Sequence, residues 1–212
     1  MPANRTQTPP PSPSSPPCPT TGESGALHHF LRAQRSGALA ILEGLTEDQL
    51  RTPVLPSGWT PIGLVEHLGH AERHWFQEVT RGTAPPLPWP TEETNPANPG
   101  DPANPGDPAN PGNPADPENP ENPENPTNPL SSEHPTAEVI AFYRSQCELS
   151  DAVLASTPLD ARPLGRHDGD LDDDVTDLRW IVLHMIEETA RHLGHLDAAR
   201  ELLDGRTGLA PR

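Results

Sequence analysis

A proline repeat limits what this chain can fold into more than any other feature of its sequence. From Asn95 to Pro129 the chain repeats the pattern Asn/Asp-Pro-x, so that every third residue is proline. Proline has no backbone N–H to donate, and its ring moves the preceding residue out of the helical region of backbone dihedral angles. We therefore expect an extended, disordered segment with partial polyproline II character. Collagen is excluded because glycine does not recur at every third position.

The apolar residues lie in two segments on either side of this repeat. Residues 23–83 and 136–208 together make up about 130 residues, which is enough for one domain with its own core. Residues 1–22 consist mostly of proline, serine and threonine and are expected to form a disordered tail. Residues 84–135 are expected to form a Pro-rich, low-complexity insertion in the domain.

Four segments show the three-to-four-residue spacing of apolar side chains that is typical of helices, and no segment is a credible strand. They cover residues 24–45, 60–82, 136–157 and 177–205. The sequence therefore predicts an all-α fold, an antiparallel four-helix bundle with the insertion between its second and third helices. A long insertion is tolerated there because the entropy of loop closure grows only logarithmically with length.

Residues with known preferences for helix ends set several of these boundaries. Thr60 is a good N-cap for the second helix, and Thr176 or Asp177 can cap the last one. Gly205 can end the last helix. A short turn of helix is expected to start on Thr46.

The net charge and the two cysteines restrict the partners and the compartment. A formal charge of −17 should repel nucleic acid and anionic lipid. No run of about 18 apolar residues is present to span a membrane, and the N-terminus lacks the features of a secretory signal. Cys18 and Cys147 have no metal-binding spacing and are not expected to form a structural disulfide. We expect a cytoplasmic protein, with Cys147 a small core residue.

Two polar residues interrupt the apolar face of the last helix. Glu188 and His192 occupy positions of a stripe that otherwise consists of Ile181, Met185, Leu196, Ala199 and Leu203. They are four residues apart, so both project from the same side of the helix. Burying an unpaired glutamate costs several kcal/mol unless it is protonated, hydrogen-bonded or bound to a cation. We therefore interpret the pair as two thirds of a divalent metal site.

The second helix offers the third ligand. At about 100° per residue, His67 lies close to the stripe that contains Leu64 and Ala71, whereas His70 points further toward solvent. Three protein ligands leave a fourth position open for water or substrate, which is the pattern of a catalytic site. Nitrogen and oxygen ligands suit zinc, with nickel or iron as alternatives. His195 is expected on a wet flank or behind His192, and the remaining histidines at the surface or its boundary: His28, His29, His70, His74 and His184.

An acidic loop at residues 165–176 invites comparison with a calcium site. An EF-hand loop counted from Asp168 requires glycine at position 173 and glutamate at position 179, where this chain has aspartate and arginine. The loop is therefore interpreted as solvated and acidic.

Several motifs resemble those of one known superfamily. In the last helix they are Leu178-Arg179-Trp180, His184-Met185-Ile186-Glu187-Glu188 and Ala190-Arg191-His192-Leu193-Gly194-His195; in the second they are Pro56-Ser57-Gly58-Trp59, Leu64-Val65-Glu66-His67-Leu68 and Glu72-Arg73-His74-Trp75-Phe76. Together they resemble the DinB-like superfamily and, within it, the mini-circle proteins. The resemblance covers residues 23–83 and 136–208.

The resemblance implies a four-helix bundle that holds a divalent metal through His67, Glu188 and His192. Relatives include mycothiol-dependent maleylpyruvate isomerases and transferases that use low-molecular-weight thiols. In these the metal binds the thiol and lowers its pKa, so that a thiolate attacks an electrophile. The resemblance also implies that homodimers occur.

We therefore expect a metal-dependent thiol S-transferase or a related detoxification enzyme, with a thiol such as mycothiol and an electrophile as its small-molecule substrates. No catalytic side chain can be assigned. An alternative is a non-catalytic metal-binding helical bundle that acts in sensing or partner binding, with the repeat as a spacer or a ligand for partner domains. A further alternative is a metal-free bundle in which Glu188 pairs with a core-facing histidine.

Overall fold

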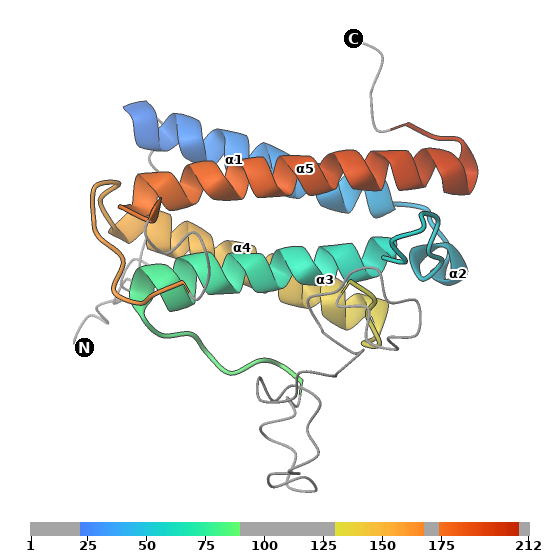
Figure 1. Ribbon diagram of the computed structural model, residues 1–212, viewed down its shortest axis with the longest axis horizontal. Coiled ribbons are helices and arrows are strands. Elements are labelled where there is room, and N and C mark those ends of the chain that lie inside the picture. Colours follow the sequence, from blue (N-terminus) through green and yellow to red (C-terminus); the bar gives the residue numbers. More distant parts are fainter. Residues whose placement is uncertain (1–21, 90–129, 168–173, 208–212) are drawn as a thin grey trace, which may run out of the picture.

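The computed structural model describes residues 22–89, 130–167 and 174–207, and these residues form helices and loops but no β-strand (Figure 1). An all-α fold is therefore confirmed. The predicted disordered repeat lies outside the described residues, as does nearly all of the predicted tail. No helix in the three described ranges is long and apolar enough to cross a membrane. The elements are α1 (Gly22–Leu42), α2 (Glu47–Leu50), α3 (Pro61–Glu72), η1 (Arg73–Val79), α4 (Thr136–Ser156) and α5 (Leu178–Asp204).

Polar caps begin and end the helices where the sequence predicted them. The Thr60 side chain accepts a hydrogen bond from the backbone N–H of Gly63 at the start of α3. Asp177 caps α5 in the same way, and Gly205 ends α5 with a left-handed φ of 78°. Thr46 forms a capping box at the start of α2. Thr60, Asp177 and Gly205 thus set ends of α3 and α5, the two helices that carry the predicted metal ligands.

The second predicted helix is not α-helical throughout. Over Arg73–Val79 its hydrogen bonds follow the wider π-helical pattern of η1. A wider turn rotates successive residues less, so that the consecutive Trp75, Phe76 and Gln77 all reach the interior. The apolar spacing of 60–82 gave no sign of this change, because it was judged only against a period of 3.6 residues.

Adjacent long helices do not all run in opposite directions. Arg179 donates to Glu23 at the starts of α5 and α1, and Arg200 donates to the carbonyl of Ile41 at their ends, so these two helices run parallel. Figure 1 shows that α3 and α4 also share a direction, opposite to that of α1 and α5. The antiparallel arrangement predicted from the sequence is therefore not confirmed as a whole.

The length of the insertion explains why α3 and α4 can run in the same direction. A helix of 21 residues is about 32 Å long, so a chain that starts a second helix in the same direction must first return along that length. The connection over residues 80–135 is long enough for this return. Crossover connections of this kind occur in other helical bundles.

The interior consists of two apolar clusters with a polar pair between them. Arg35 on α1 lies between Leu31 of one cluster and Ala38 of the other, and on α3 Glu72 lies between Leu68 and the π-helical segment. Arg35 and Glu72 are 4% and 0% exposed and form two hydrogen bonds with each other. The centre of the bundle is thus held by a buried ion pair.

The two described ends of the insertion meet on the bundle. The rings of Trp89 and His134 are stacked with their centroids 4.1 Å apart. The carbonyl of Leu130 accepts a hydrogen bond of 3.2 Å from the backbone N–H of Thr60. Leu130 approaches α3 so closely that a Cβ atom on Gly63 would lie 1.8 Å from the Leu130 oxygen. The insertion therefore leaves and re-enters the fold at one place.

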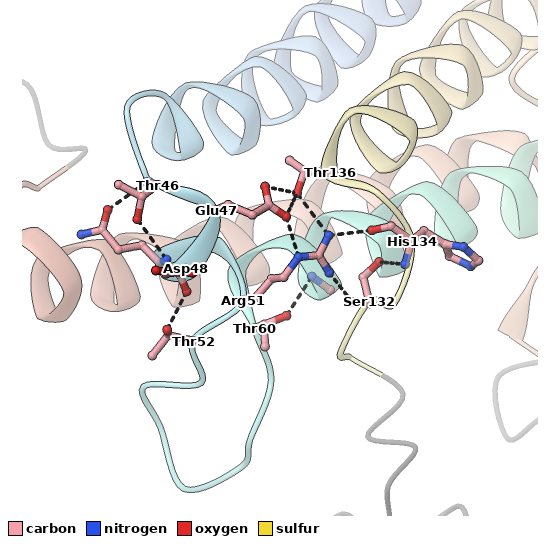
Figure 2. A network of polar contacts seen from close by, with 11 residues as sticks. Thr46, Glu47, Asp48, Arg51, Thr52, Thr60, Ser132, His134 and Thr136 are labelled. Carbon is pink, nitrogen blue, oxygen red and sulfur yellow. Dashed lines mark hydrogen bonds and ion pairs between the residues drawn. The ribbon is translucent and has the colours of Figure 1, made fainter.

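Arg51 anchors the returning end of the insertion (Figure 2). Its guanidinium donates to the carbonyls of Ser132 and His134 over 2.6 and 2.7 Å, and to Glu47 over 2.6 Å. The hydroxyl of Thr136 donates to Glu47 over 2.8 Å. This network joins α2 to the start of α4.

Because both ends are anchored, we predict that deleting residues 95–129 leaves the fold intact. The free energy of unfolding should stay equal or rise by about 1 kcal/mol, since a shorter loop costs less entropy to close. Urea denaturation measures this value. Arg51→Gln is the matched control: it keeps the loop but breaks the anchor, and should destabilise by about 1–2 kcal/mol. A deletion more damaging than this control would contradict the prediction.

Candidate functional site

The three side chains predicted as metal ligands lie together where α3 faces α5. His67 Nε2 is 3.2 Å from Glu188 Oε1, and His192 Nε2 is 2.8 Å from the same oxygen. The two imidazole centroids are 4.9 Å apart. All three ligand atoms lie within 4.8 Å of one another, and no other group of three or more metal-ligating side chains in the described ranges comes as close.

The phase of α5 aims Glu188 and His192 at this place. Ile181, Met185 and Leu196 are fully or almost fully buried and define the inward face of the helix. Glu188 and His192 continue that face, and their side chains are 23% and 13% exposed. The sequence prediction that they interrupt an apolar stripe is therefore confirmed.

His67 stands at the margin of the bundle. Its neighbours Leu64 and Leu68 are buried, whereas its own side chain is 36% exposed. His70, three residues later, turns instead toward α4, where its ring lies 5.0 Å from that of Phe142. The group of three ligands is therefore partly buried, with access from solvent on the side of His67.

Hydrogen bonds keep the Glu188 carboxylate ionised. The bonds from His192 and from His67 hold the pKa of Glu188 well below its ordinary value, and they outweigh the effect of burial, which would raise it. An ionised carboxylate only accepts hydrogen bonds, so both rings donate to Glu188 through Nε2. Nδ1 of His192 is buried and has no hydrogen-bond partner among the described residues. The protein alone thus leaves one polar atom of the site unsatisfied.

The donor set fits a divalent cation. Two imidazole nitrogens and one carboxylate oxygen are ligands that zinc, nickel and iron accept. Ligand atoms around a tetrahedral zinc ion lie about 3.3 Å apart, given bonds of roughly 2.0–2.1 Å. The observed separations of 3.2 and 2.8 Å from Glu188 Oε1 lie close to that value.

An aromatic cluster that the sequence did not predict lies one helical turn before Glu188. The ring of His184 is stacked on Trp180 at 5.1 Å and meets Trp75 edge-on at 4.6 Å. His167 is stacked on the other indole, Trp75, at 4.7 Å. Burial lowers the pKa of His184, which favours its neutral form. Its spacing of four from both Trp180 and Glu188 was the available signal, but its other ring partner, Trp75, comes from η1.

The other histidines divide between expected and unexpected positions. His195 is exposed, as predicted for a wet flank, with its ring 5.6 Å from that of His192. His28 was predicted at the surface or its boundary, and this is wrong: it is 5% exposed and lies 2.8 Å from Asp151. Its carboxylate partner comes from α4, a contact that the local sequence of α1 could not reveal.

The interpretation of the acidic loop stays a prediction, because residues 168–173 lie outside the described residues. Immediately after these residues in the sequence, Asp174 and Thr176 are exposed to solvent.

Cys147 is unsuited to act as a nucleophile. Burial, and then the charge of Glu72, raise the pKa of its thiol to about 12. We predict that iodoacetamide at pH 7.5 alkylates Cys147 at least about a thousandfold more slowly in the folded protein than in urea, since only the thiolate reacts. Mass spectrometry of peptides from a time course measures this ratio, and Cys18 gives an internal comparison. Equal rates in the folded and unfolded protein would refute it.

Comparison with models of known protein families identifies the family of this chain. The family model described as Mycothiol-S-transferase matches residues 26–205, from α1 to the end of α5. The matched region contains all three candidate ligands. No curated protein and no solved structure matches the chain.

Proposed function

We propose, from the premise that the chain belongs to the mycothiol S-transferase family of the DinB-like superfamily, that it joins mycothiol to an electrophile with the help of a divalent metal ion. The family makes the chain a thiol S-transferase, and the dependence on a metal is our inference. The observation that carries it is the convergence of His67, Glu188 and His192, each of which offers a ligand atom within 4.8 Å of the other two.

Each of the three ligands would supply one donor atom to the cation. His67 and His192 would bind through Nε2, and Glu188 would contribute an ionised oxygen whose charge offsets part of that of the cation. When bound, the cation would lower the pKa of a thiol, so that thiolate is available at neutral pH. The exposed side of His67 leaves access for the thiol. The stacked rings of Trp180 and His184, both partly exposed, would supply an aromatic surface near Glu188 for an electrophile.

We also propose the identity of the metal, the extent of the domain, the oligomeric state and the compartment. The metal is zinc, with nickel or iron as alternatives. Residues 23–83 and 136–208 form one domain, a DinB-like four-helix bundle of the mini-circle branch that pairs as a homodimer. The protein acts in the cytoplasm, where low-molecular-weight thiols are kept reduced.

A metal-free site is the second candidate, and a specific observation favours it. Glu188 Oε1 already accepts hydrogen bonds from both His67 and His192, so the carboxylate is satisfied without a cation. Melting with and without a chelator separates the two states, because a metal that binds only the folded chain must raise its melting temperature. An unchanged melting temperature would favour the metal-free site.

The activity itself is tested with a panel of substrates. Untagged protein of known metal content is assayed with mycothiol, glutathione and cysteine against epoxides, alkyl halides and Michael acceptors, and loss of electrophile is followed. We expect turnover with mycothiol and metal, and none after the metal is removed. Metal binding without turnover on any pair would instead favour the non-catalytic metal-binding bundle.

A further inference from the structure

A cavity lies on a different face of the bundle from the proposed metal ligands. It has a volume of about 210 Å³ and opens between α1 and α4, whereas the three ligands lie on α3 and α5. Arg35 and Tyr143 are its buried members, and Arg32 and Arg144 are exposed. Nothing in the thiol-transfer reaction requires this cavity.

The buried part of the cavity contains a donor without an acceptor. Tyr143 is 0% exposed, and its hydroxyl has no hydrogen-bond partner among the described residues. The thiol of Cys147 lies beside it, but a thiol is only a weak acceptor. A buried hydroxyl is costly to leave unsatisfied, so this group points to an acceptor atom supplied from outside the chain.

The rim carries two arginines that have no acidic partner. Neither Arg32 nor Arg144 makes an ion pair or a side-chain hydrogen bond within the described residues, although both line the same cavity. The chain has 31 acidic residues and only 14 basic ones, so most arginines have a carboxylate to bind. Two unpaired guanidinium groups therefore lie beside one cavity.

The remaining charges of the lining leave the cavity positive. Arg35 is engaged by Glu72 and Asp151, and Asp151 also by His28, so these groups neutralise one another. Glu148 is the one other carboxylate in the lining, and it has no ion pair within the described chain. Two guanidinium groups thus face one carboxylate.

We propose that this cavity binds a small oxyanion, of the phosphate or carboxylate class, through Arg32, Arg144 and the Tyr143 hydroxyl. A guanidinium group donates two parallel hydrogen bonds to either kind of anion, and the tyrosine O–H donates a third from the buried side. The volume admits an anion of only a few heavy atoms together with water. Glu148 opposes the bound charge and thereby weakens binding.

The test uses the full-length, metal-free protein, so that no anion can bind through a cation at the other site. Inorganic phosphate and acetate are titrated by calorimetry and by thermal melting, with sodium chloride at equal ionic strength as the reference. Saturable binding of either probe is expected, and the tighter of the two identifies the class. Arg32→Gln and Arg144→Gln should each weaken binding at least tenfold. Tyr143→Phe should weaken it several-fold, and Glu148→Gln should strengthen it.

A matched control distinguishes a site from a general salt effect. Arg162 is an exposed arginine without a polar partner among the described residues, and it lies outside this cavity. Arg162→Gln should therefore bind both probes like the unmodified chain. An equal, non-saturating stabilisation in every variant would mean that the anions act only by exclusion from the surface, and would overturn the proposal. Absence of binding by both probes would overturn it as well, with water as the occupant.

Discussion

Protein with His192→Ala is expected to lose its metal almost completely. The unmodified chain, purified without a histidine tag, should hold about one divalent ion per chain, and the variant less than about one tenth of that. Only His67 and Glu188 would remain, and two ligands hold a cation far less tightly than three. Loss of an outer partner of a metal ligand already costs 10–100-fold in affinity or activity, so loss of a ligand should lower the transferase rate at least about a hundredfold. Elemental analysis and an initial-rate assay measure both effects.

The same variant should also lose the stabilisation that the metal provides. At a free metal concentration a thousand times the dissociation constant, that stabilisation is about 4 kcal/mol. The melting temperature of the unmodified chain should therefore fall on chelation, and that of the variant should not change.

His195→Ala is the matched control for this experiment. His195 lies on the same helix three residues later, its ring is 5.6 Å from that of His192, and it is exposed. It should keep its metal and its chelator-sensitive melting. Equal metal content in the unmodified chain and in the His192→Ala variant would remove the basis for the metal site.

The parts of the fold that depend on local sequence could be predicted. Thr60, Asp177 and Gly205 act within a few residues of themselves, and the helix ends that they set agree with the prediction. Glu188 and His192 could be recognised because a 3.6-residue period decides which face of a helix is buried. His67 followed from the same geometry applied to a second helix.

Features that depend on contacts between distant segments could not be predicted. The parallel course of α3 and α4 depends on the path of a long insertion, which no local period records. The π-helical turn brings Trp75 to His184, a residue more than one hundred positions later. The environment of His28 depends on Asp151, and that of Glu72 depends on Arg35, which lies on another helix.

The buried pair of Arg35 and Glu72 should dominate the stability of the fold. Arg35 Nε and Nη2 donate to the two oxygens of Glu72 over 2.7 and 2.6 Å, and Nη1 donates to Asp151 over 2.7 Å. The side chains of Arg35 and Glu72 are 5% and 0% exposed. Arg35→Met leaves the buried charge of Glu72 uncompensated and should destabilise the protein by about 3–5 kcal/mol. Glu72→Leu leaves Arg35 with Asp151 as its remaining acidic partner, so its effect should be smaller than that of Arg35→Met.

The double variant Arg35→Met/Glu72→Leu is expected to be more stable than either single variant. Both desolvation penalties disappear when an apolar pair of similar volume replaces the ions, so the free energy of unfolding should return to within about 1–2 kcal/mol of the unmodified value. Urea denaturation of all four proteins gives the coupling energy, provided that the denaturant slopes agree. Additive losses would mean that the two side chains do not act as a pair. The metal content of the double variant then tests whether the ion pair matters for function, because α3 carries both Glu72 and His67. If the double variant folds but binds metal weakly, the ion pair positions α3 against α5.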